Sequence, residues 1–155
     1  MDIEAIIPEK KEEEIFHERN ESDTLGKLYD SLAKAQLEML PAKTSSNNPF
    51  FKSKYADLAE VVGSSRKALA NNSLSVIQRI LPQKSGGMIL YTRIGHASGE
   101  WIESKMPIRL DKPGIQSFGS SLTYLRRYMY AAMVGVVASG EDDDGELAMQ
   151  GMRKN

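Results

Sequence analysis

Residues 74–108 read LSVIQRILPQKSGGMILYTRIGHASGEWIESKMPI and carry the clearest secondary-structure pattern of the chain. Apolar and polar residues alternate here with a period near two, which is typical of half-buried strands. Two turn sequences, QKSGG and ASG, divide the stretch into predicted strands at 74–81, 88–97 and 100–108. Strands joined by such short turns pair with their neighbours, so the pattern predicts a three-stranded antiparallel meander.

A long helix is predicted after the meander. A basic loop, RLDKPG at 109–114, leads into residues 116–138, which show a helical period. Beyond residue 129 the sequence is apolar or small on every side, so we expect this half to be covered by the sheet and by either an N-terminal helix or a second subunit. The apolar stripe comprises Phe118, Leu122, Leu125, Met129, Ala132, Met133 and Val136.

Two helices are predicted ahead of the meander. The first spans about four turns from Leu25, with Ser22 to Thr24 as a cap and Pro41 as a stop. The second runs from Tyr55 or Ala56 to residue 70, after a loop at 41–54. Two helices, three strands and one long helix, without a βαβ rhythm, place the chain in the α+β class. The inward face of the first helix is expected to comprise Leu25, Leu28, Tyr29, Leu32, Gln36, Met39 and Leu40.

Composition limits the classes of function. The chain has 155 residues, which indicates one domain at 23–147 with an acidic N-terminal lead at 1–22 and a short tail at 148–155. It contains no cysteine, which excludes disulfides, thiolate nucleophiles and zinc–cysteine sites. No signal peptide and no apolar run of membrane-spanning length is visible, so a soluble cytoplasmic protein is expected.

The charges are segregated along a chain that is almost neutral overall. Residues 1–42 carry 5 basic and 11 acidic side chains, residues 43–127 carry 13 and 5, and residues 128–155 carry 2 and 5. Such asymmetry suggests a polyanionic partner for the middle of the chain. A basic segment that merely neutralises the acidic ends is an equally good explanation at this level.

The segment NPFFKSKYADL at 48–58 places aromatic rings next to lysines. Rings stack on bases and lysines attract phosphates, so the pattern favours binding of a single nucleic-acid strand. In the alternative, one or both phenylalanines plug the loop from beneath and the lysines are only solvated. The candidate DNA-binding residues of this segment are Phe51, Lys52, Lys54 and Tyr55.

Two further groups of residues could bind DNA. The helical segment GSSLTYLRRY at 119–128 offers Tyr124 for stacking and Arg126 and Arg127 for phosphates, although an ordinary surface helix would look similar. The strands carry cations that would form a basic strip if they shared a face, although exposed strands commonly carry such charges. These cations are Arg79, Arg93 and Lys105, with Arg109 and Lys112 just beyond the strands.

The acidic run GEDDDG at 140–145 is the one candidate for a metal. Its Asp142, Asp143 and Asp144 could hold Mg²⁺, which would suit a metal-dependent nuclease, but there is no second acidic cluster. The run could equally cap a short helix or pair with a basic patch on another subunit. No catalytic triad and no phosphate-binding GxxxxGK[ST] loop is visible, so we expect no enzyme, no ATPase and no required cofactor.

With these motifs in view, the chain resembles the essential recombination function (Erf) family of phage-type single-strand annealing proteins. The resemblance rests on NPFFKSKYADLAEV at 48–61, on SLSVIQ, and on QSFGSSLTYLRRYMYAAMVGVVASGEDDDG at 116–145. It implies a β-β-β-α core that assembles into rings or filaments around a basic groove. It also implies DNA contacts at Arg126 and Arg127, and in the same groove at Arg79, Arg93 and Lys105.

The function expected from the residues and the resemblance together is ATP-independent binding and annealing of single-stranded DNA in homologous recombination. The expected partners are single-stranded DNA, the annealed duplex intermediate and further copies of the chain, with a partner exonuclease or a host single-strand binding protein as additional candidates and no membrane. The resemblance also implies a phage or prophage protein in a bacterial host. The alternatives are a general single-strand binding protein and, less favoured, the metal-dependent nuclease.

Overall fold

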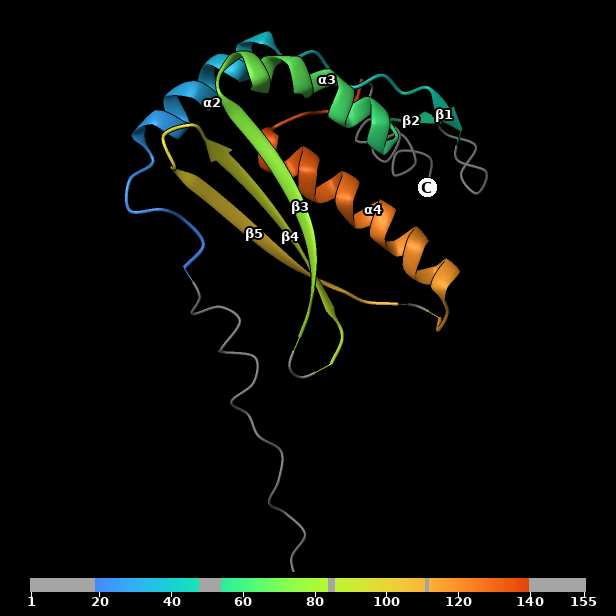
Figure 1. Cartoon of the computed structure of the whole chain (residues 1–155). Helices are drawn as coiled ribbons and strands as arrows, with labels where there is room; N and C mark the ends of the chain where they lie inside the picture. Colours follow the sequence, from blue (N-terminus) through green and yellow to red (C-terminus); the bar gives the residue numbers. More distant parts are fainter. Residues whose placement is uncertain (1–18, 48–53, 84–85, 111, 140–155) are drawn as a thin grey trace, which may run out of the picture.

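The computed structural model describes residues 19–47, 54–83, 86–110 and 112–139. Within them, a three-stranded antiparallel sheet in the order β3-β4-β5 is followed by the long helix α4 and preceded by helices α2 and α3. Figure 1 shows α4 crossing one side of the sheet, with α2 and α3 lying over one end. The predicted α+β class and the meander followed by a long helix are therefore confirmed.

The strands β3 (Leu74–Pro82), β4 (Met88–His96) and β5 (Trp101–Ile108) lie within one or two residues of the predicted ranges. Their register places Val76 opposite Ile94 and Ile94 opposite Ile102, so these apolar side chains share one face. That face packs against α2, α3 and α4, and buries Leu74 and Ile94 in the core. The period of two in the sequence thus reflects one covered face.

Helix α2 (Gly26–Glu38) is shorter than predicted because Met39 is already extended. Its buried face is Leu28, Leu32 and Ala35. The prediction that Tyr29 and Leu40 point inward is wrong, since both are exposed. Tyr29 lies about 100° around the helix from the buried Leu28, and Leu40 lies beyond the end of α2, after the extended Met39.

The N-terminus of α2 is capped by a residue from elsewhere in the chain. Leu25 makes no side-chain capping bond, and the predicted cap at Ser22 to Thr24 is wrong. Instead, the carboxylate of Glu100, in the β4–β5 turn, accepts a 2.7 Å hydrogen bond from the Leu28 amide and a 3.0 Å bond from the Thr24 hydroxyl. These bonds lower the pKa of Glu100 from its ordinary value, the Leu28 amide having the larger effect.

Helix α3 (Leu58–Asn71) begins after Tyr55, which belongs to a short strand. The Asp57 carboxylate accepts a 3.0 Å bond from the Glu60 amide and a 2.9 Å bond from the Ser46 hydroxyl. Those bonds, the one from Glu60 first, lower the pKa of Asp57. The predicted loop at 41–54 holds β1 (Ser46–Asn47) and the first residue of β2 (Lys54–Tyr55). The second helix begins at Leu58, so its predicted start at Tyr55 or Ala56 is wrong.

Helix α4 (Ile115–Val134) ends four residues before the predicted position. Gly135 adopts the left-handed φ of 78°, and a Cβ there would lie 2.8 Å from the Gln36 side-chain nitrogen. Beyond it, Ala138 forms an isolated bridge with Ala42, whose amide donates to the Val137 carbonyl over 2.9 Å. Glycine at this position therefore ends the helix and permits the close approach of α2.

The second half of α4 is covered on two sides, as expected, and α3 provides the second cover. The Tyr130 and Ser65 hydroxyls are 2.9 Å apart and buried between the two helices. Tyr130 and Val134 are among the most buried residues of α4, whereas Ala132 of the predicted stripe is exposed. The stripe toward the sheet was thus predicted with one error, and of the two expected covers for the other side, an N-terminal helix is the one present.

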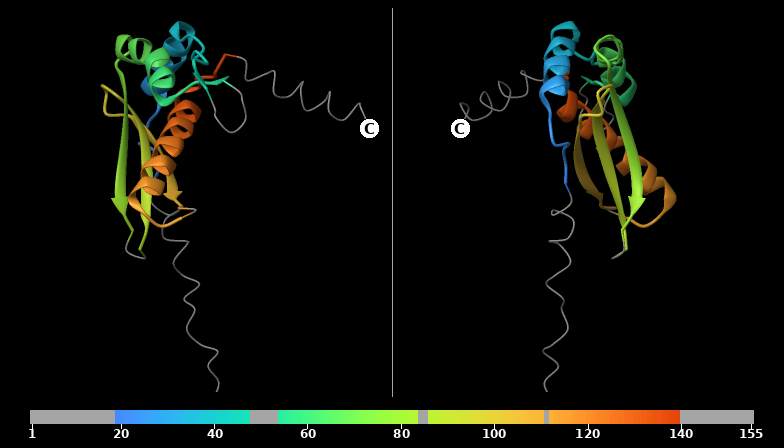
Figure 2. Two further views of the ribbon diagram at one scale, coloured as in Figure 1. Left: turned by 90° about the vertical axis from the view of Figure 1, so that its right-hand side faces the viewer. Right: turned by 60° about the vertical axis from the view of Figure 1, so that its left-hand side comes forward.

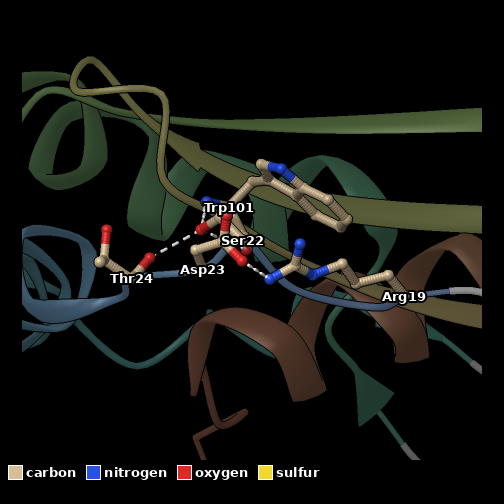
Figure 3. A network of polar contacts seen from close by, with 5 residues as sticks. All are labelled: Arg19, Ser22, Asp23, Thr24 and Trp101. Carbon is tan, nitrogen blue, oxygen red and sulfur yellow. Dashed lines mark hydrogen bonds and ion pairs between the residues drawn. The ribbon is translucent and has the colours of Figure 1, made fainter.

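A segment of the predicted N-terminal lead runs along the open edge of β5. The Ser22 amide donates to the Trp101 carbonyl and the Trp101 amide donates to the Ser22 hydroxyl, both over 2.9 Å, and Arg19 forms an ion pair with Asp23 (Figure 3). The Glu103 amide donates to the Asn20 carbonyl over 2.7 Å. Residues 19–22 are therefore attached to the sheet, while residues 1–18 and the tail at 148–155 lie outside the described residues.

Of the helices that the structure describes, none has the length and hydrophobicity of a membrane-spanning segment.

Candidate nucleic-acid interface

Two of the predicted groups of residues meet beside α4. The short strand β2 carries Tyr55, whose ring contacts Arg127 of α4, and Arg127 lies among aromatic rings. The Arg127 guanidinium carbon is 4.9 Å from the centre of the Tyr55 ring, 4.7 Å from that of Tyr128 and 5.6 Å from that of Tyr124. We refer to Tyr55, Tyr124, Arg126, Arg127 and Tyr128 as the α4 surface.

Arg127 is fixed in place as well as charged. One of its terminal nitrogens donates a 3.0 Å hydrogen bond to the Ala56 carbonyl, just before α3 begins. A guanidinium has five N–H donors, so this bond leaves others for a phosphate. The aromatic contacts and the bond to the Ala56 carbonyl orient the guanidinium group, and its other N–H donors can still bind a phosphate.

The two exposed tyrosines of α4 form a stacking platform. The rings of Tyr124 and Tyr128 are 4.4 Å apart between centres, and 56% and 47% of these residues is exposed. A hydrogen bond with Tyr128, and secondly burial, raise the pKa of Tyr124, so its hydroxyl stays uncharged at neutral pH. Neutral, exposed rings beside a cation are suited to stacking on bases.

Arg126 leaves the helix in a different direction from Arg127. Its Nε donates a 3.2 Å bond to the side-chain oxygen of Gln78 in β3, and the Gln78 amide nitrogen donates a 3.0 Å bond back to the Arg126 carbonyl. The Gln78 amide also donates to the buried Thr92 hydroxyl. Arg126 itself is exposed, so its charge faces solvent on the β3 side of α4.

A hollow of about 670 Å³ adjoins the α4 surface on the β5 side of the helix. Tyr124 forms part of its wall, so the hollow and the tyrosine platform are continuous. Arg109 and the hydroxyls of Ser120 and Ser121 supply its polar groups. Its apolar lining comes from Met106, Pro107 and Leu125.

The predicted strand cations share a face, but it is the face away from α4. Arg79 is opposite Tyr91 and Tyr91 is opposite Lys105, while Arg93 is opposite Glu103. These positions alternate with Val76, Gln78, Ile94 and Ile102, whose side of the sheet carries the helices. The expectation that Arg79, Arg93 and Lys105 line one groove together with Arg126 and Arg127 is therefore wrong for a single protomer.

Several predicted residues are not placed by the structure. Phe51 and Lys52 lie outside the described residues, as does the acidic run with Asp142, Asp143 and Asp144. Lys54 is placed by its backbone, which pairs with Asn47. Across the described part of the chain, no three His, Asp or Glu side chains gather in a way that could hold a metal ion.

Tyr128, Gln78, Tyr91 and Trp101 were not predicted as site residues. The spacing of Tyr124 and Tyr128, four residues apart on a helix, could have indicated the ring pair. The contacts of Tyr91 and Trp101 depend on strand register, and that of Gln78 with Arg126 depends on how α4 packs on the sheet.

The chain belongs to the ERF superfamily, whose family model matches residues 28–155. The match begins within α2 and includes the whole α4 surface. Comparison with curated proteins and with solved structures gives no significant match. At the level of the family, membership supports a function in single-strand annealing of DNA and in recombination.

Proposed function

We propose that this protein binds single-stranded DNA on its α4 surface and anneals it to a complementary strand during homologous recombination, without ATP. The observation that carries the proposal is the placement of Arg127 among Tyr55, Tyr124 and Tyr128, with Arg126 alongside. A cation for the phosphates and exposed rings for the bases are the two components that sequence-independent strand binding needs.

The proposed mechanism requires no covalent step. Arginines hold the phosphates of an extended strand, and stacking on Tyr124 and Tyr128 prevents the strand from folding on itself. Base edges that remain exposed can test a second strand for complementarity. Pairing then provides the free energy, about 1.4 kcal/mol of stacking per base-pair step.

The protein is proposed to act as a homo-oligomer, either a ring or a helical filament. The α4 surface of one protomer contacts only a few nucleotides, and joining several copies converts weak sites into tight binding. An exonuclease that produces the single strand and a host single-strand binding protein that covers it are the proposed accessory partners.

One assay separates this function from its alternatives. Two complementary labelled oligonucleotides are mixed with the protein without ATP, with and without Mg²⁺, and both duplex formation and strand length are followed. Faster duplex formation with intact strands is the expected result. Binding without faster annealing would indicate a general single-strand binding protein, and Mg²⁺-dependent shortening of the strands would indicate a nuclease.

A further inference from the structure

The sheet face opposite α4 combines cations with aromatic rings in a regular array. We call it the outer sheet face, and Figure 2 shows that α2, α3 and α4 leave it uncovered. Cross-strand register arranges its side chains in rows, so that Arg79, Tyr91 and Lys105 form one row across the three strands and Ile77, Arg93 and Glu103 form the next. Trp101, opposite Gly95, follows in the third row.

Each ring on this face is in contact with a cation. Tyr91 lies between Arg79 and Lys105, with 5.8 Å from its ring centre to the guanidinium carbon and 5.6 Å to the ammonium nitrogen. Arg93 lies over Trp101, with 3.9 Å between the guanidinium carbon and the ring centre. Cation–π contacts of this kind hold long side chains flat along the strands and direct their charges across the sheet.

These rows contain one carboxylate, that of Glu103, and the cations Arg79, Arg93 and Lys105, so the outer sheet face has a net positive charge. Glu103 Oε2 is 2.8 Å from Arg93 Nε and 3.8 Å from an Arg79 terminal nitrogen, and the Glu103 side chain is only 5% exposed. The side chains of Arg79 and Arg93 are 51% and 36% exposed. The acid therefore lies beneath the arginines, while the positive charges reach the solvent.

We propose that the outer sheet face is a second surface for single-stranded nucleic acid, separate from the α4 surface. The ligand would be an extended polyanion with flat bases, whose phosphates pair with Arg79 and Lys105 and whose bases stack at Tyr91 and Trp101. The sheet itself separates the two surfaces, so one protomer can contact two strands at once. The ligand class follows from the proposed function, but the location rests only on the contacts of this face.

Trp101 provides a direct probe, because it is the only tryptophan in the chain. The full-length protein is titrated with unlabelled oligo(dT) while tryptophan fluorescence is followed, and total binding is measured in parallel by the anisotropy of a dye-labelled oligo(dT). Oligo(dT) cannot pair with itself, so annealing does not contribute. We expect the fluorescence of Trp101 to change on binding.

Three double variants test which surface causes the change in Trp101 fluorescence. Arg79→Ala with Lys105→Ala should abolish the Trp101 response at moderate salt and lower the salt slope of total binding by about 1.4, at about 0.7 for each lost phosphate contact. Arg126→Ala with Arg127→Ala should keep the response. Arg66→Ala with Lys67→Ala, which removes two exposed charges from α3, is the matched control and should behave as the parent. Glu103 keeps its bond to Arg93 in all three, and circular dichroism checks that each variant is folded.

Two results would overturn the inference while leaving the proposed function intact. One is binding by anisotropy with no change in Trp101 fluorescence. The other is a response that persists without Arg79 and Lys105 but disappears without Arg126 and Arg127, since Trp101 would then report assembly or binding at the α4 surface. Absence of any binding by the parent protein would contradict both proposals.

Discussion

Arg127 combines two tasks that are usually divided between residues. Its guanidinium joins the start of α3 to the middle of α4 through the Ala56 carbonyl, and it supplies a permanent charge between three rings. The flat shape of the fork matters for both tasks, because it can stack on a ring and donate from its edge. Lysine would keep the charge and lose the shape.

The substitution Arg127→Lys separates charge from shape. A lysine still neutralises one phosphate, so the salt dependence of single-strand binding should stay close to that of the parent protein. Affinity should fall several-fold at every salt concentration, because stacking and bidentate bonding are lost. Binding isotherms at four salt concentrations measure both quantities. An affinity and a slope that both equal those of the parent protein would show that shape does not matter at this position.

At the level of helices and strands, the sequence predicted the type and order of the elements better than the residues at which the helices begin and end. The three strands and the order of helices follow from periods of two and 3.6 together with turn residues, and these are local signals. The ends of α2 and α3 depend on Glu100 and Asp57, and the first of these is remote in sequence. No local pattern could show that a carboxylate in the β4–β5 turn caps a helix more than seventy residues earlier.

The Glu100 cap predicts a pH dependence of stability. The pKa of Glu100 is lowered in the folded protein, so its stabilising contribution is complete above the ordinary value of 4.5 and is lost as the pH falls through the lowered folded value. Glu100→Gln should therefore lower the urea midpoint at pH 7. The difference from the parent protein should shrink as the pH is taken below 4.5, because protonation removes the charge from the parent as well.

Urea unfolding of both proteins between pH 7 and pH 3 gives this comparison. Thr24→Ala, which removes the weaker partner of the same carboxylate, should show the same trend with a smaller effect. A stability difference that is constant with pH would mean that the charge of Glu100 is not what holds α2.

For the molecule as a whole, the sequence left a second subunit as one possible cover for the apolar half of α4, and the structure gives that role to a helix of the same chain. The second half of α4 is covered by α3, and the edge of β5 is paired at residues 101–103 with residues 20–22. A different apolar surface is exposed at the end of α2, where Leu37 and Leu40, two residues past the helix, are 89% and 72% exposed. Strand β3 also ends the sheet with an unpaired edge in the described part of the chain.

Replacement of Leu37 by Glu tests this surface. Exposed apolar stripes usually mark contacts between subunits, so the variant should have a lower mass in light scattering at micromolar concentration, with its fold unchanged. Lys34→Glu, on the same helix but in an ion pair with Asp30, is the control for added negative charge and should assemble as the parent does. A monomeric parent protein, with and without single-stranded DNA, would contradict the proposed assembly itself.

The candidate site could be predicted only in part, because some of its contacts join residues that are remote in the sequence. Tyr55, Tyr124 and Arg127 were named from local composition and do meet, because β2 lies against α4. The division of the cations between two faces was not predictable without the register of the strands. A shift of one residue would have moved Arg79 and Arg93 to the helix side.

The central claim, that the α4 surface holds the DNA strand, is tested most directly by the salt dependence of single-strand binding. The measurement compares the parent protein with the Arg126→Ala, Arg127→Ala double variant, and the Arg66→Ala, Lys67→Ala pair is again the control. Two lost phosphate contacts should lower the slope of log affinity against log salt by about 1.4, with the control unchanged. A folded double variant whose slope equals that of the parent would contradict the account.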